Sequence, residues 1–111
     1  MFDATRRDNP AARSFVDQLA LTVPFTDYGG QEKIAPLPRP LAMTGMPAGD
    51  HAERLDIGYY ATGGVLVLYY TDVAYYRGIA RLGHVHATVD DLKDILDGAV
   101  ATIELTPDHH S

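Results

Sequence analysis

The segment from Leu55 to Val85 constrains the fold of this chain more than any other stretch. It contains three strand-like runs in succession, Leu55–Ala61, Val65–Tyr70 and Arg81–Val85, rich in β-branched and aromatic residues. A glycine pair separates the first two runs, and a loop that contains Asp72, Tyr75, Tyr76 and Gly78 separates the last two. We therefore expect a small antiparallel sheet on which the rest of the chain packs.

The run Val65–Tyr70 is continuously apolar instead of alternating. A strand of this kind is covered on both faces. In a small antiparallel barrel one face points into the barrel, so we expect a helix, the loop or a partner subunit to cover the other. This two-sided strand is one reason to expect a homodimer.

The composition narrows the class of protein. The chain has 111 residues, enough for one domain with a single core. Its net charge of −6 argues against a nucleic-acid partner, and the absence of cysteine excludes disulfides and cysteine-ligated zinc. No apolar run approaches the roughly 18 residues of a membrane helix, and the N-terminus does not resemble a signal peptide. We expect a soluble cytoplasmic protein that contacts neither nucleic acid nor membrane.

Two helices are indicated outside the central segment. Asn9 is suited to cap a helix whose first position is Pro10, and apolar residues at helical spacing extend this helix to about Ala20. Thr88 and Asp91 have the spacing of a capping box. They predict a second short helix over Thr88–Leu96, with Val89, Leu92, Ile95 and Leu96 as its buried stripe and Gly98 as its terminator.

The remaining segments supply further strands and one long loop. Met1–Asp8 is expected to be the end of a strand, and further strands are expected over Leu21–Phe25 and Val100–Leu105. Gln31–Ala35 is expected to be either a short strand or an extended segment. Ala42–Arg54, rich in glycine, proline and alanine, is expected to be a loop and a candidate mobile flap. We predict a mainly β single domain over residues 1–106, closed as a barrel or a strongly curved sheet, with a tail over residues 107–111.

Three blocks of sequence carry a family resemblance. They are DNPAARSF, TDYGGQEKIAPLPRPL and DIGYYATGGVLVLYY followed by YYRGIARLGHV. In order and spacing they resemble the bacterial cyclophilin-like domain family of small, largely uncharacterised proteins, over Phe2–Leu105. The resemblance implies a cyclophilin-like antiparallel β-barrel with two short helices.

The chain departs from this family pattern at two places. A strand precedes the one that ends near Thr5 in the family, so we expect either a shortened start or a barrel open at one edge, which invites pairing with another chain. This open edge is the second reason to expect a homodimer. The family's Pro-Trp-Gly-Asn is replaced by Thr62–Val65, so we do not expect an aromatic ligand contact at this position.

The resemblance also raises peptidyl-prolyl isomerase activity as an alternative function. Cyclophilins use an arginine, a glutamine beside the buried strand and an aromatic floor. Here the residues after Gly64 are apolar, and Arg39, Arg77 and Arg81 lie in no cyclophilin-like local motif. Because a shared fold does not carry its function with it, we do not expect isomerase activity.

Paired tyrosines are the most conspicuous candidate contacts. Tyr59-Tyr60, Tyr69-Tyr70 and Tyr75-Tyr76 each place one ring on either face of a strand, and Tyr28 stands apart. Such rings either line a ligand pocket or simply fill the core and cover the surface, and the second is the more common.

Charged residues offer three further candidates, each with a plainer alternative. His84 and His86 share a strand face and could bind a metal with Asp56 or Asp90, although two solvated histidines are more frequent. Asp27 and Glu32 are either acid–base groups or, for Asp27, a turn residue that accepts backbone N–H groups, which we favour. Asp72 and Arg77 are expected to pair across their loop, unless Arg77 recognises an anion or a carbonyl in a groove.

The sequence therefore predicts a non-catalytic domain that binds a small molecule or a peptide in a groove lined by the tyrosine-rich strands and the loop over residues 43–54. The expected ligand contacts are Tyr28, Glu32, Arg39, Tyr59, Tyr69, Tyr76 and Arg77, with no catalytic residue, metal or cofactor. The alternatives are an isomerase with an altered site, or an interaction module that partners a redox, flavodoxin-like protein.

Overall fold

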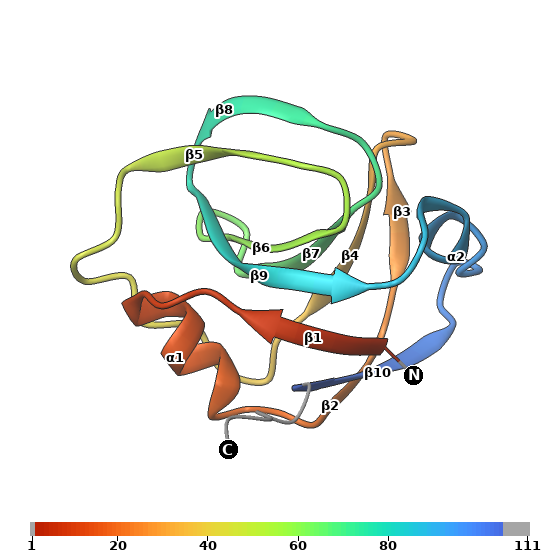
Figure 1. Cartoon of the computed structure of the whole chain (residues 1–111), viewed down its shortest axis with the longest axis horizontal. Coiled ribbons are helices and arrows are strands. Elements are labelled where there is room, and N and C mark those ends of the chain that lie inside the picture. The colour runs from red at the N-terminus through yellow and green to blue at the C-terminus, as the bar shows by residue number, and fades with distance from the viewer. Residues whose placement is uncertain (1, 106–111) are drawn as a thin grey trace, which may run out of the picture.

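A computed structural model describes residues 2–105, and the predicted tail over residues 107–111 lies outside this range. Eight strands form one curved sheet in the order β2-β10-β1-β9-β6-β7-β4-β3, and β5 and β8 form a separate two-stranded ribbon. Figure 1 shows the sheet wrapping around a central core, with α1 at one end and α2 at the other. The predicted mainly β, barrel-like fold with two short helices is confirmed.

The element bounds follow the sequence prediction closely in the central segment. The strands are β1 (Phe2–Arg6), β2 (Leu21–Pro24), β3 (Thr26–Tyr28), β4 (Glu32–Pro36), β5 (Gly49–Ala52), β6 (Asp56–Tyr60), β7 (Val65–Tyr69), β8 (Val73–Arg77), β9 (Ile79–His86) and β10 (Val100–Leu105). The helices are α1 (Pro10–Val16) and α2 (Val89–Lys93).

Both helices begin where the sequence predicts and end earlier. The Asn9 side chain accepts the backbone N–H of Ala12, and the Thr88–Asp91 capping box is present. α1 ends at Val16 instead of near residue 20, and α2 ends at Lys93. As a result Leu96 lies past the helix and is 77% exposed, so its predicted place in the buried stripe is wrong.

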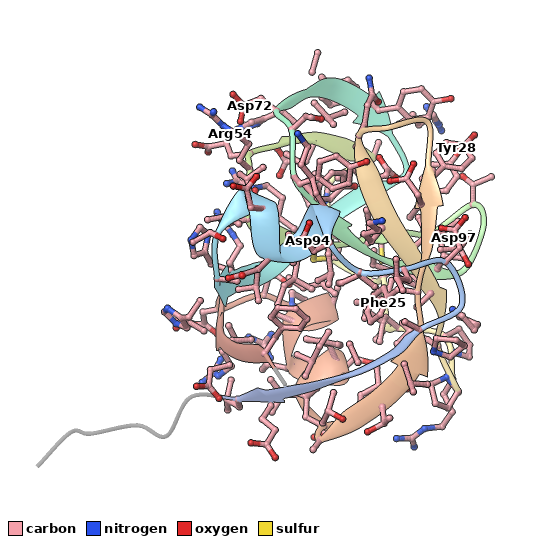
Figure 2. All side chains as sticks on the ribbon, turned by 90° about the vertical axis from the view of Figure 1, so that its right-hand side faces the viewer. Phe25, Tyr28, Arg54, Asp72, Asp94 and Asp97 are labelled. Carbon is pink, nitrogen blue, oxygen red and sulfur yellow. The ribbon has the colours of Figure 1, made fainter. Side chains whose placement is uncertain are left out.

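The sheet closes on itself through a single residue. The two edge strands, β2 and β3, are consecutive in the chain, and Phe25 joins them. Phe25 is fully buried, its N–H donates to the Ala99 carbonyl at 3.0 Å, and its own carbonyl accepts the Gly98 N–H at 2.7 Å. Figure 2 shows Phe25 beside the segment that leads from α2 into β10.

The N-terminal strand lies inside the sheet. β1 pairs antiparallel with β9 on one side and parallel with β10 on the other. The expected open edge at this strand is therefore wrong, because both of its edges are already paired.

The ribbon of β5 and β8 replaces two expected loops. The segment expected to be a flap contains β5, and the predicted loop before Gly78 contains β8, which pairs with it from Gly49 to Ala52. The ribbon lies over the outer face of β7 (Figure 1), where Ala52, Val67 and Tyr69 form a small second core. The sequence predicts that a helix, a loop or a partner subunit covers this face of β7. In the structure the ribbon of the same chain covers it.

The main core fills the inside of the sheet. Its fully buried side chains come from both helices and most strands and include Phe15, Phe25, Ile57, Leu66, Leu68, Leu82, Leu92 and Ile103. No helix among residues 2–105 is long and apolar enough to cross a membrane. Both faces of β7 are covered, and both edges of β1 are paired. The two observations that motivated a homodimer are therefore accounted for within one chain, and the homodimer stays a prediction.

Candidate functional site

The residues that the sequence offered as ligand contacts do not gather in one place. Tyr59 is buried in the main core and Tyr69 in the second core, on opposite faces of the sheet. The other five lie nearer the surface: Glu32 is half-buried, and Tyr28, Arg39, Tyr76 and Arg77 are exposed.

Some of these residues share the outer face of the sheet. Tyr28 lies opposite Glu32 across β3 and β4, and Glu32 lies opposite Tyr69 across β4 and β7. Tyr76 reaches this face from the ribbon, with its ring 5.9 Å from that of Tyr60. Burial raises the pKa of Glu32. We call Tyr28, Glu32, Tyr60 and Tyr76 the tyrosine face.

The carboxylates of Asp27 and Asp72 bond to other groups of the protein. The Asp27 carboxylate accepts the Gly30 N–H at 3.1 Å, which confirms its turn role, and it also accepts the Tyr70 hydroxyl. Asp72 pairs with Arg54 at 3.5 Å, and Figure 2 shows the two side by side. The predicted pair of Asp72 and Arg77 is therefore wrong, because the ribbon brings the end of β5, not of β8, to Asp72.

Two adjoining depressions lie elsewhere, between the start of α1 and the ribbon. Their volumes are about 300 and about 440 Å³, and both are lined by Arg7 and Arg81. We call them together the arginine cleft. The first is lined also by Thr5, Arg6, Glu53, Arg54, Asp56, Gly83 and His84, and the second by Asp8, Asn9, Gly45, Met46, Pro47 and Asp50.

A β-bulge in β9 aims side chains into this cleft. Ile57 lies opposite Gly83 but the next residue, Gly58, lies opposite Arg81, so one residue of β9 is extra. The bulge changes the alternation of the strand. Leu82 and Val85 consequently both enter the core, while Arg81 and His84 both face outward.

The floor of the cleft depends on Gly83. A Cβ atom at this position would lie 2.2 Å from the Thr5 carbonyl oxygen, a distance that no side chain tolerates. Glycine allows β1 to approach β9 closely here.

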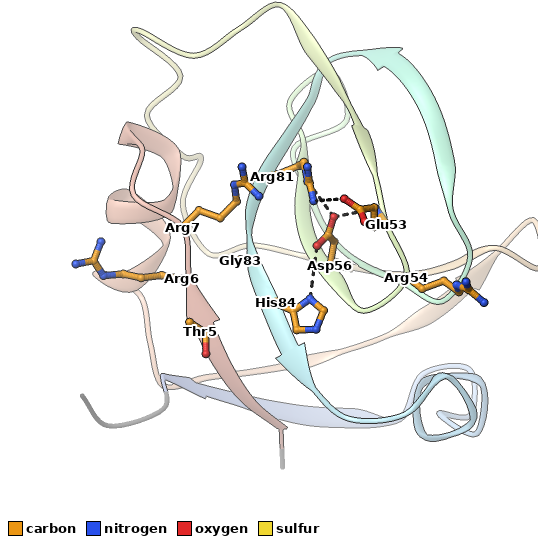
Figure 3. A pocket seen from close by; sticks show the side chains of 9 residues that line it. All are labelled: Thr5, Arg6, Arg7, Glu53, Arg54, Asp56, Arg81, Gly83 and His84. Atoms are coloured by element: carbon orange, nitrogen blue, oxygen red, sulfur yellow. Dashed lines mark hydrogen bonds and ion pairs between the residues drawn. The ribbon is translucent and has the colours of Figure 1, made fainter. Parts of the chain in front are cut away.

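Asp56 and Arg81 form the fixed part of the cleft (Figure 3). The Asp56 carboxylate is buried, and it accepts Arg81 Nε at 2.9 Å and the Glu53 N–H at 2.8 Å. The Arg81 guanidinium also donates to Glu53 Oε2 at 2.9 Å. Burial would lower the pKa of Arg81, but the bonds to Asp56 and Glu53 outweigh it and raise that pKa. The Arg81 guanidinium is therefore charged and is held by the carboxylates of Asp56 and Glu53.

Two histidines border this network. His51 lies with its ring nitrogens 2.9 Å from Asp50 and 3.4 Å from Glu53. His84 Nδ1 lies 3.7 Å from Asp56 Oδ1, and its ring contacts that of His86 edge-on at 6.3 Å. Within residues 2–105 no group of three or more His, Asp or Glu side chains is placed to hold a metal ion. Asp56 thus lies near His84, but Asp56, His84 and His86 are not placed together as three ligands of one metal ion.

Arg7 differs from its charged neighbours. Its N–H donates to the Leu82 carbonyl at 2.8 Å, and Asn9 Nδ2 donates to the Arg81 carbonyl at 2.9 Å, which fixes the backbone on both sides of residue 8. Figure 3 shows the Arg7 side chain reaching toward β9, whereas Arg6 and Arg54 point away. Among the residues that the structure describes, no carboxylate pairs with Arg7.

Sequence reasoning missed this cleft as a site. It named Arg81 only as an available arginine, and Asp56 and His84 only as metal ligands. One local signal was available: Arg6-Arg7 stands directly before the helix cap Asn9, where a strand must end and turn. The bulge that turns Arg81 and His84 to one face has no comparable signal in the residues themselves.

The cleft offers three features to a ligand. They are the Arg7 guanidinium, which no carboxylate among residues 2–105 pairs with, the bonded group of Arg81, Glu53 and Asp56, and a short apolar strip at Met46 and Pro47. The lining contains neither the glutamine nor the aromatic floor that an isomerase of the cyclophilin type would need.

Comparison with known proteins supports the fold and adds one finding about relationship. A family model described as the cyclophilin-like family matches residues 1–106. Comparison with curated proteins and with solved structures gives no significant match. The family match spans nearly the whole chain and agrees with the curved sheet, its two helices and its filled interior. This chain is a member of the cyclophilin-like family.

Proposed function

We infer that this protein is a non-catalytic binding domain whose ligand, a small molecule or a short peptide segment, lies in the arginine cleft. The observation that carries this proposal is the junction of the two depressions at Arg7 and Arg81. Their combined size suits a small ligand, because binding pockets usually enclose about 300–1,000 Å³. The proposed function is the binding function that the sequence predicts, but the proposed site is the arginine cleft instead of the predicted groove.

The walls of the cleft are preorganised, which favours binding. Asp56, Glu53 and Arg81 are joined by charge-assisted hydrogen bonds that connect β6, β9 and the segment after β5. A rigid site loses little conformational entropy when a ligand arrives.

The two alternative functions have weaker support. An isomerase of the cyclophilin type needs an arginine beside a glutamine and an aromatic floor for proline, and the lining of the cleft contains neither glutamine nor Phe, Tyr or Trp. An interaction module for a redox partner was expected to expose the apolar outer face of β7, and the ribbon covers that face.

An NMR screen tests the proposal. Backbone ¹H–¹⁵N spectra recorded with pools of small polar molecules and short peptides should show shifts clustered on the cleft, at Arg7, Gly45 and Gly83. Shifts clustered on Tyr28 and Tyr76 instead would place binding on the tyrosine face and overturn the proposal. A peptide assay of prolyl isomerisation, run beside it, should give only the uncatalysed rate.

A further inference from the structure

Arg7 carries a positive charge that no carboxylate among residues 2–105 pairs with. The other arginines that line the cleft each have a carboxylate partner in this range. Arg6 lies 3.8 Å from Asp8, Arg54 3.5 Å from Asp72, and Arg81 2.9 Å from both Glu53 and Asp56. Asp8 also pairs with Arg13 at 2.8 Å, and Asp50 lies 2.9 Å from a ring nitrogen of His51. Among the arginines that line the two depressions, Arg7 is thus the one without a carboxylate partner in the described part of the chain.

The carboxylates nearest Arg7 do not substitute for a ligand. Asp8 and Asp50 line the same depression, but Asp8 pairs with Arg6 and Arg13, and Asp50 accepts the His51 backbone N–H at 2.8 Å and lies 2.9 Å from a His51 ring nitrogen. Arg81 lines both depressions together with Arg7, but Glu53 and Asp56 already hold its guanidinium, so Arg7 is the arginine that is available to a ligand.

An apolar strip lies beside this charge. Met46 and Pro47 line the second depression together with Arg7. Met46 is half-buried and packs against the main core, so its position is fixed from behind. A ligand that reaches Arg7 with its head group places its body against this strip.

We propose that the ligand of the arginine cleft is a small organic anion, whose carboxylate or phosphate head binds Arg7 and whose apolar body packs on Met46 and Pro47. The planar guanidinium donates two parallel N–H groups to either head. The inference rests on the proposed binding function and adds the chemical class of the ligand.

The test uses four probes that share one body and differ in head group: butyrate, monobutyl phosphate, butyramide and butylammonium. Each is titrated into the ¹⁵N-labelled full chain, and dissociation constants are fitted from the shifts at Gly45 and Gly83. Butyrate or monobutyl phosphate should bind more tightly than the neutral and cationic probes. The tighter of the two anions identifies the head group.

Two variants assign the binding to Arg7. Arg7→Gln should weaken the better anion about tenfold, the loss expected when a charge-assisted hydrogen bond is removed. Arg39→Gln is the matched control, because this arginine is exposed and lines neither depression, and it should change the affinity less than about twofold. Both side chains are exposed, so unchanged thermal unfolding confirms that the fold is kept.

The outcomes separate this inference from the proposed function. Equal binding of butyramide or butylammonium, or equal effects of the two variants, overturns the anion assignment. If only the neutral or cationic probe shifts cleft amides, the assignment fails and cleft binding stands. If none of the four shifts any cleft amide at millimolar concentration, both fail.

Discussion

Asp56 shows how one buried carboxylate organises the cleft. It is 4% exposed and bonds to Arg81 and to the Glu53 backbone, so it aligns two walls at once. We predict that Asp56→Asn lowers the free energy of unfolding by about 3 kcal/mol, because it leaves the Arg81 charge half-buried without its main partner. Urea unfolding measures this loss.

Asp72→Asn provides the control for that prediction. It removes a carboxylate from the exposed pair with Arg54 and should cost less than about 0.5 kcal/mol. Similar losses in the two variants would show that Asp56 is no more than a surface ion-pair partner.

Asp27 predicts a pH dependence of stability. The hydrogen bond from Tyr70 lowers its pKa most; burial opposes this, and the Gly30 N–H and Lys33 lower it further. A folded pKa below the unfolded value of about 4 means that Asp27 stabilises the fold above that pH, and that this contribution is lost as pH falls through the folded pKa. Acid should therefore destabilise the wild-type chain in this window.

Tyr70→Phe tests this assignment, because it removes the largest cause of the lowered pKa. The difference in melting temperature between wild type and Tyr70→Phe should narrow from about pH 6 to about pH 2. A difference that stays constant over this range would mean that the hydrogen bond does not depend on the charge of Asp27.

At the scale of elements, the β5–β8 ribbon is the part most able to open locally. Its own core is small, with Ala52, Val67 and Tyr69 at its centre, and four of the five residues of β8 are exposed. Native-state hydrogen exchange should show β8 amides exchanging through local opening, and β7 amides only through global unfolding. Equal protection in β7 and β8 would contradict this difference.

The ribbon also marks where the sequence was a poor guide to elements. β7 and β10 were predicted almost to the residue, because an apolar run and a clean alternation each have only one good interpretation. β5, with the sequence Gly-Asp-His-Ala, has little strand propensity and forms only because β8 pairs with it. Such pairing depends on the fold of the intervening residues and is not visible locally.

The cleft was missed for a related reason. Alternation along β9 places Arg81 and His84 on opposite faces, and the bulge at Leu82 puts them on the same one. Adjacent tyrosines are conspicuous in the sequence, but which of their rings are buried depends on the face of the sheet that the ribbon covers. Family and fold were accessible from sequence, whereas the location of the depressions required the register of three strands.

At the scale of the whole molecule, Phe25 closes the sheet. We predict that Phe25→Ala lowers the free energy of unfolding by about 3–5 kcal/mol, because it leaves a cavity at the join of β2 and β3. The control is Leu96→Ala at an exposed position two residues before Gly98, whose N–H donates to the Phe25 carbonyl, and it should cost less than about 0.5 kcal/mol. Chemical unfolding that gives comparable losses for both would contradict the role of Phe25 in closure.

The central claim is that ligands bind in the arginine cleft and not on the tyrosine face. The most direct test is a crystal structure of the protein as purified from cells, inspected for density that belongs to a bound small molecule. The account predicts such density against Arg7, with its body toward Met46 and Pro47. A molecule bound instead against Tyr60 and Tyr76, with the arginine cleft empty of ligand, would contradict it.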